Sequence, residues 1–274
     1  MQRVFYTLSL LALTQLIVGA AGCSLMKPRD SALANYERTR RELSGDGSSV
    51  EPAQYTEDDV PLPAPLKAKD FAPERIGATV RRLTGNGPNP KEAKVLYAQA
   101  QQAYAVAAQQ KLQNPTFDSR PQYAAAAKLF ESAAEKWPES EIEQDGYYMA
   151  GESYFFADYY WDAETNYEKL MKKYQNSKHI DAVQPRRFAI AQYWLELHRK
   201  DPKSFYELNV IDEATPTRDV FGHSMRVYDR IRLDDPTGKL ADDATLALGN
   251  AYFAAGKFMK ADEYYTDLRK TFPS

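Results

Sequence analysis

Three histidines and two acidic pairs are the side chains whose types could support metal binding or acid–base chemistry. The histidines are His179, His198 and His223; their spacing matches no zinc site and no cysteine lies near them. The pairs Asp234–Asp235 and Asp242–Asp243 fall near presumed helix starts, where carboxylates satisfy free N–H groups and the helix dipole. No calcium-loop motif or nucleophile elbow surrounds them. We therefore expect no enzyme, no cofactor and no metal site.

The chain's single cysteine, Cys23, follows a stretch with the three parts of a secretory signal. Arg3 is its basic start, residues 4–18 are apolar, and residues 20–22 are small. The stretch resembles a bacterial lipobox, which implies a cleaved lipoprotein signal peptide over residues 1–22 and lipidation (palmitate) of Cys23. The alternative, an uncleaved membrane anchor, is disfavoured because the apolar stretch is short and interrupted by polar residues.

The residues after the cysteine predict a membrane-tethered protein. Ser24 replaces the Asp that in proteobacterial lipoproteins favours inner-membrane retention, so the expected location is the outer membrane, facing the periplasm. Residues 23–70 comprise the lipidated N-terminus and a flexible tether rich in Pro, Gly and Ser. Residues 71–90 predict a short amphipathic helix and a turn.

Residues 144–177 are similar to the 34-residue tetratricopeptide pattern, in which two antiparallel helices form a hairpin. The conserved slots of that pattern are filled, in order, by Tyr147, Ala150-Gly151, Tyr154, Ala163 and Tyr167. A second match covers residues 242–274. Because one hairpin cannot bury its own apolar face, further copies are expected.

Two interrupted copies complete the predicted array, which spans residues 91–274. They cover residues 91–140 and 182–238, the latter with an insertion at 200–219. The equivalent positions Ala126, Ala163, Ser224 and Ala261 are spaced 37, 61 and 37 residues apart. The sequence therefore predicts an all-α tetratricopeptide-repeat solenoid of about four helical hairpins, preceded by the signal peptide and tether.

In such arrays the first helix of each hairpin lines a concave groove, and the repeat register indicates which residues face it. The candidate peptide groove comprises Tyr148, Met149, Glu152, Phe155, Phe156, Phe188, Gln192, Leu195, Leu246, Asn250 and Phe253. Its aromatic content favours an apolar or aromatic peptide segment as the ligand. In the alternative interpretation, these residues pack against an additional helix or against the 200–219 insertion.

The charge balance argues against a nucleic-acid partner. Loss of Arg3 with the signal leaves 34 basic and 38 acidic residues, a net charge of −4. Nucleic-acid-binding proteins usually carry an excess of basic residues, which this chain lacks.

The lipobox, the tether, hairpins ending in "KWPES" and "KTFPS", and a third repeat broken by an insertion resemble the BamD-like outer-membrane assembly lipoproteins. The resemblance implies a periplasm-facing scaffold whose partners are envelope proteins, including the outer-membrane β-barrel insertase and its clients. One alternative is a tetratricopeptide lipoprotein that coordinates cell-wall or division factors, although the coiled coil expected before such repeats is absent. Another is a docking subunit of an envelope enzyme.

Overall fold

The computed structural model describes residues 87–202, 208–209 and 212–272, and this part of the chain is all-α. It contains eight α-helices and no strand. The predicted signal peptide, Cys23, the tether and the short helix expected after residue 70 lie outside the described residues, and so does part of the 200–219 insertion.

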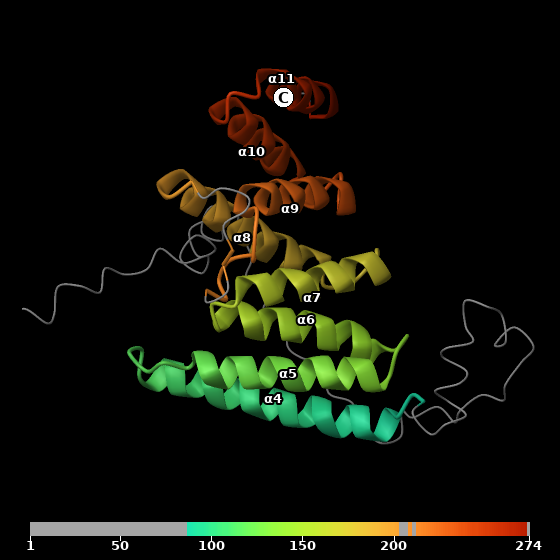
Figure 1. Ribbon diagram of the computed structural model, residues 1–274. Helices are drawn as coiled ribbons and strands as arrows, with labels where there is room; N and C mark the ends of the chain where they lie inside the picture. Colours follow the sequence, from blue (N-terminus) through green and yellow to red (C-terminus); the bar gives the residue numbers. More distant parts are fainter. Residues whose placement is uncertain (1–86, 203–207, 210–211, 273–274) are drawn as a thin grey trace, which may run out of the picture. The chain divides into compact units, whose positions relative to one another are not determined.

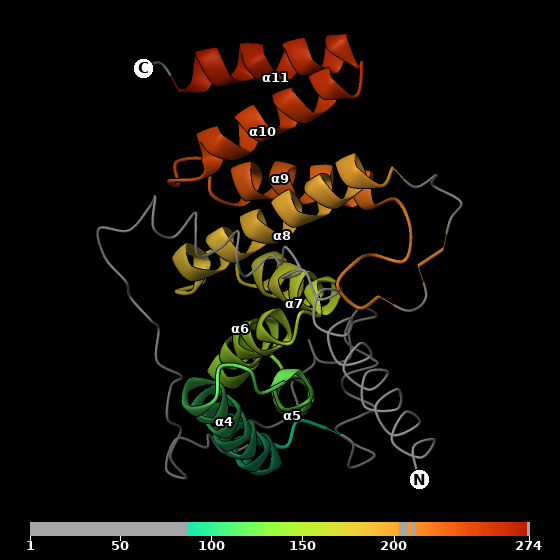
Figure 2. The ribbon, with the colours of Figure 1, turned by 90° about the vertical axis from the view of Figure 1, so that its left-hand side faces the viewer.

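The helices form four consecutive pairs. Their bounds are α4 (Pro90–Gln113), α5 (Arg120–Lys136), α6 (Glu141–Phe156), α7 (Tyr160–Lys173), α8 (Ile180–Lys200), α9 (Val220–Asp234), α10 (Ala241–Ala254) and α11 (Phe258–Thr271). Each helix packs against the next one along the chain, and Figures 1 and 2 show them stacked in chain order. This arrangement is compatible with a helical repeat solenoid.

Local side-chain caps fix where several helices begin. The Asn89 side chain accepts a hydrogen bond from the Glu92 amide at 3.1 Å, and the Ser140 hydroxyl accepts one from the Glu143 amide, also at 3.1 Å. The Glu143 carboxylate in turn accepts a 2.7 Å hydrogen bond from the Glu139 amide. The first two bonds satisfy amides of the first helical turn, which have no intrahelical partner, and the third holds the residue that precedes the cap of α6.

Two hairpins, α6–α7 and α10–α11, have the same close approach at equivalent positions. A Cβ placed on Gly151 would lie 2.4 Å from Cε1 of Tyr167, and one on Gly249 would lie 2.6 Å from Cε1 of Tyr265. In both hairpins only a glycine leaves room for the ring of the second helix to lie against the first. The residue that follows each glycine accepts a hydrogen bond from the tyrosine hydroxyl. Glu152 accepts it from Tyr167 at 2.6 Å, and Asn250 accepts it from Tyr265 at 2.9 Å.

The same two hairpins share one type of turn. In α6–α7 the amide of Tyr159 donates to the carbonyl of Tyr154 at 2.9 Å, and in α10–α11 Lys257 donates to Tyr252, also at 2.9 Å. These are the long bonds of a Schellman motif, which places the preceding residue in the left-handed region. That residue is Gly256 in the last hairpin (φ 71°) and Asp158 in the earlier one (φ 62°).

The connection from α8 to α9 is the longest between the described helices, and a hydrogen bond joins it to the buried core. The indole N–H of Trp194 donates to the carbonyl of Ala214 at 2.8 Å, and both residues are buried. Asp219 then caps the start of α9, and its carboxylate accepts a hydrogen bond from the Gly222 amide at 2.9 Å. The described part of the insertion therefore covers the end of α8.

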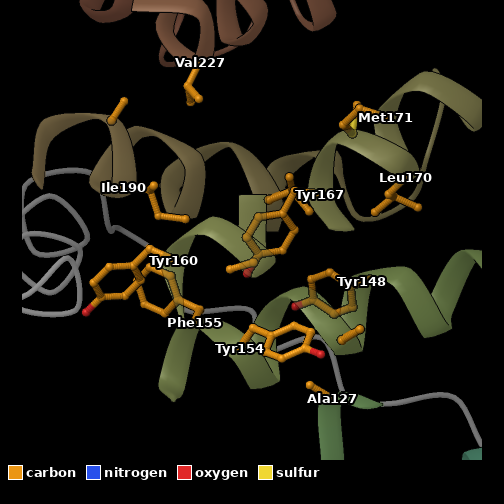
Figure 3. Close-up of a cluster of buried hydrophobic side chains, with 14 of the residues drawn as sticks. Ala127, Tyr148, Tyr154, Phe155, Tyr160, Tyr167, Leu170, Met171, Ile190 and Val227 are labelled. Carbon is orange, nitrogen blue, oxygen red and sulfur yellow. The ribbon is translucent and has the colours of Figure 1, made fainter. Parts of the chain in front are cut away.

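Aromatic rings fill the space between neighbouring helices. Figure 3 shows Tyr148 and Phe155 of α6 facing Tyr160 and Tyr167 of α7, whereas Tyr154 lies on the side of Ala127 of α5. Ile190 of α8 and Val227 of α9 continue the same cluster toward the later helices. The small residues Ala150, Ala163 and Ala191 are fully buried, so backbones approach closely where the rings leave room.

Candidate functional site

The structure does not bring the eleven predicted groove residues onto one open surface. Tyr148, Met149, Glu152, Phe155 and Leu195 are buried, whereas Phe156, Phe188 and Gln192 are partly buried. Exposed side chains occur only in the last copy, at Leu246, Asn250 and Phe253. The prediction of a continuous accessible groove through all three copies is therefore wrong for these residues.

The rings of α6 are used for packing in the described structure. Phe155 is 0% exposed, and its ring centroid lies 5.5 Å from that of Tyr160. The guanidinium of Arg186 lies 4.9 Å from the Phe155 centroid. Tyr148 stacks on His179, with centroids 4.1 Å apart and ring planes 5° from parallel. The burial of both rings corrects their assignment as accessible ligand contacts.

Glu152 is held in a buried polar cluster instead of facing a ligand. Its carboxylate accepts hydrogen bonds from Arg186 at 2.8 Å and from the Tyr167 hydroxyl at 2.6 Å. Burial, followed by the charge of Glu152, raises the pKa of Tyr167 well above its usual value, so this hydroxyl remains a donor. Glu152 therefore links α6 to both α7 and α8.

This cluster has a sequence signal that the groove prediction did not use. Glu152 and Arg186 are 34 residues apart, and so are Asp145 and His179, whose side chains meet at 2.6 Å. Both pairs join α6 to α8 or to the residue just before it, so a separation of 34 residues brings side chains of adjacent hairpins together. A search for an acidic residue followed by a basic one at that separation would have indicated contacts between adjacent hairpins.

The candidate residues of α8 also take part in packing. Phe188 makes an edge contact with Tyr228 of α9 at 5.1 Å, and Leu195 is buried beside Trp194. Trp194 is in turn bonded to Ala214 of the insertion. In this copy Phe188 therefore packs within its own hairpin, and the side chain that contacts the insertion is Trp194, which is not one of the predicted groove residues.

The last copy presents an accessible apolar surface. Leu246 and Phe253 on α10 are 40% and 57% exposed, and the intervening Asn250, also exposed, accepts the Tyr265 hydroxyl. Positions 246, 250 and 253 follow the i, i+4, i+7 spacing of one helix face. This face is the part of the candidate groove that remains available to a partner.

We expect Phe155→Ala to destabilise the fold and Phe253→Ala to leave it almost unchanged. Truncating a fully buried phenylalanine costs about 3 kcal/mol, because apolar burial is lost and a cavity remains. Truncating an exposed one changes stability by about 0.5 kcal/mol or less. Urea denaturation followed by circular dichroism measures both values. Equal losses in the two variants would contradict the assignment of Phe155 to the core and Phe253 to the surface.

The three histidines lie in separate packing environments. His179 bonds to the buried Asp145, His198 packs on Phe221 at 5.2 Å, and His223 lies edge-on to Trp161 at 4.7 Å. The described part of the chain contains no cluster of three or more His, Cys, Asp or Glu side chains suited to a metal ion.

His223 gives the fold a predictable response to acid. Burial, followed by the positive charge of Arg226, lowers its pKa from 6.5 to about 4, while Asp219 and Glu168 act in the opposite direction. The unfolded chain therefore binds a proton at higher pH than the folded one, and stability falls as the pH drops from about 6.5 to about 4. After allowance for solvent screening of a partly exposed ring, this loss is roughly 1–2 kcal/mol.

The measurement compares wild type with His223→Phe, which keeps a ring beside Trp161 but cannot titrate. Urea denaturation at pH 7 and pH 4.5 should show a smaller loss of stability in the variant. The remaining carboxylates titrate in both proteins and therefore cancel in the comparison. An identical pH dependence would contradict the role given to His223.

Buried and partly buried ion pairs link the middle of the array. Arg187 of α8 is 0% exposed; it donates to Glu164 of α7 at 3.0 Å and to Asp234 of α9 at 2.6 Å. Nearby, Arg230 of α9 pairs with Glu168 of α7. The sequence analysis missed this network, because nothing local in the sequence distinguishes Arg187 from a solvated arginine.

Searches against models of protein families, curated proteins and solved structures found no match. Among the described helices, none is both long and apolar enough to cross a membrane.

Proposed function

We propose that this protein is a membrane-anchored tetratricopeptide scaffold that binds other envelope proteins and performs no catalysis. The observation that carries the proposal is the equivalence of hairpins α6–α7 and α10–α11. Both have a glycine against a tyrosine ring, a hydroxyl bond to the next position and a Schellman turn. Repeats of this kind serve mainly to present extended binding surfaces.

The accessible face of α10 supports a role in binding. Leu246, Asn250 and Phe253 combine two large exposed apolar side chains with an amide, a composition suited to an apolar peptide segment. The proposed class of partner is a protein of the outer-membrane β-barrel assembly machinery, consistent with the BamD-like sequence features. Under this proposal Cys23 carries the lipid, and the scaffold faces the periplasm from the outer membrane.

The test is affinity capture of the full-length lipidated protein from solubilised membranes, followed by mass spectrometry. Recovery of the β-barrel insertase with wild type, and its loss with Leu246→Arg, would support the proposal. Val95→Arg is the matched control, because Val95 of α4 is also an exposed apolar residue and is remote in sequence. Recovery of cell-wall or division proteins without the insertase would instead assign the scaffold to that class.

Anchoring is tested separately. Cys23→Ser should move the protein from the membrane fraction to the soluble periplasmic fraction, because the cysteine thiol is the point of acyl attachment. Retention of this variant in the membrane at wild-type levels would contradict lipidation as the anchor.

A further inference from the structure

The turn of the last hairpin exposes an unusual run of apolar and basic side chains. Every residue from 253 to 260 is exposed, and we call this segment the tip. Phe253, Phe258 and Met259 are 57%, 62% and 84% exposed. The two phenylalanine rings meet edge to face, with centroids 5.3 Å apart. The tip therefore presents a small apolar group that projects into solvent.

The geometry of the turn fixes this projection. Gly256 has a φ of 71°, and the Gly256 amide donates to the carbonyl of Phe253 at 3.0 Å. Together with the bond from Lys257 to Tyr252, this completes the Schellman motif that ends α10. The apolar side chains therefore extend from a closed turn that holds them at one end of the hairpin.

Two lysines lie beside these apolar side chains. Lys257 is held 5.4 Å from the ring centroid of Phe221 and 5.9 Å from that of Tyr252, while Lys260 lies 5.3 Å from Tyr252. Such cation–π contacts orient the ammonium groups while leaving them hydrated. The lysine positions are thus fixed relative to the apolar group by the last turn of α10 and the first turn of α9.

The charged side chains of the tip itself are both lysines, and the exposed carboxylates of Asp262 and Glu263 follow it on α11. Residues 251–261 contain two lysines and no acidic residue, although the whole chain carries a net charge of −3. The nearest acidic positions on α11 are Asp262 and Glu263, in its next turn. On α9, Asp229 is bonded to Arg232 at 2.8 Å, so part of its charge is offset locally.

We propose that the tip docks on a lipid surface that contains anionic headgroups. Phe258 and Met259 would enter the boundary between headgroups and acyl chains, while the lysines pair with lipid phosphates. Bulky apolar residues flanked by lysines are the composition that favours binding at this interface. An apolar group that projects from a closed turn also suits insertion at the boundary of a lipid surface.

The proposal adds a second contact to the membrane-anchored scaffold described above. Under that proposed function, a lipid on Cys23 alone would give the folded part no preferred orientation at the membrane. Docking of the tip would fix which end of the array lies against the membrane. Because a single weak contact gains from being tethered to the same surface, even modest affinity at the tip would be effective.

The experiment uses the full chain carrying Cys23→Ser, so that no acyl group is attached and one new thiol can be labelled. An environment-sensitive fluorophore is placed at Met259→Cys or, as control, at Leu112→Cys, where the native leucine is 82% exposed. Vesicles of phosphatidylcholine with phosphatidylglycerol should raise emission several-fold at position 259 only. Quenchers attached to lipid chains should then suppress that emission.

A charge-reversal variant tests the role of the lysines. Lys257→Glu with Lys260→Glu should weaken vesicle binding, measured at position 259, by about 30-fold, since each basic residue near an anionic surface contributes about 1 kcal/mol. The control pair, Lys91→Glu with Lys128→Glu, makes the same charge change at exposed positions of α4 and α5 and should leave binding within about twofold.

An unchanged signal at position 259 with anionic vesicles would overturn the proposal, and so would equal signals at positions 259 and 112. A response only to an added membrane protein would also overturn it, because the tip would then be a protein contact. Partner capture and the release of Cys23→Ser from membranes are separate readouts. Failure of the scaffold proposal is therefore distinguishable from failure of the lipid contact.

Discussion

Gly151→Leu is expected to abolish the native fold or to destabilise it by about 4 kcal/mol or more. Even a Cβ at this position would lie 2.4 Å from the ring of Tyr167. That ring is 0% exposed and its hydroxyl is bonded to Glu152, so it has no free space to enter. A leucine side chain would separate α6 from α7. Urea denaturation followed by circular dichroism and tryptophan fluorescence measures the effect.

Gly249→Leu is the matched control. The contact distance is nearly the same, with a Cβ 2.6 Å from the Tyr265 ring, but Tyr265 is only partly buried and lies in the last described helix. Its ring can rotate toward solvent, so the expected cost is about 1–3 kcal/mol. A Gly151→Leu protein with wild-type stability would show that α6 and α7 are not packed through this position.

Arg187→Met is expected to destabilise the fold by about 3–5 kcal/mol. The substitution preserves most of the side-chain volume but removes the guanidinium from a fully buried site. Glu164 is then left buried without its main partner, while Asp234, which is partly exposed, can be hydrated. The loss therefore arises mainly from one uncompensated carboxylate. Chemical denaturation at pH 7 measures it.

Two controls separate this cause from a packing defect. The double variant Arg187→Met with Glu164→Met should recover most of the loss, because a buried ion pair replaced by apolar groups is often nearly neutral. The single variant should also lose less stability at pH 5 than at pH 8. Burial raises the pKa of Glu164 while Arg187 lowers it, so removal of Arg187 lets Glu164 take up a proton. A pH-independent loss that the double variant does not recover would contradict the ion-pair explanation.

The hairpins could be predicted because their determinants are local in the sequence. Helix periodicity and the small residues at Gly151 and Ala163 indicate where two adjacent helices meet, and the structure places both residues in buried contacts. The copy expected from residue 91 begins with α4, whose first residue is Pro90. Information of this kind depends on neighbours within about one helical turn or one hairpin.

The accessible surface could not be predicted in the same way. Repeat register indicates which face a residue occupies, but it does not indicate what packs over that face. Glu152 lies under Arg186 of the next hairpin, which hydrogen-bonds to its carboxylate. Trp194 lies under the 200–219 insertion, where its indole hydrogen-bonds to the Ala214 carbonyl. The tip could not be predicted either, because residue types around a turn do not indicate how far the flanking side chains project.

The lengths of the four hairpin turns have a consequence for how this fold can be modified. They span residues 114–119, 157–159, 201–219 and 255–257, and the helices on either side remain packed in every case. Turn length is therefore largely independent of helix packing, as expected when a loop's closure entropy grows slowly with its length. Sequence inserted at these turns adds new surface at small thermodynamic cost, which makes them natural positions both for evolutionary diversification and for grafting a reporter domain.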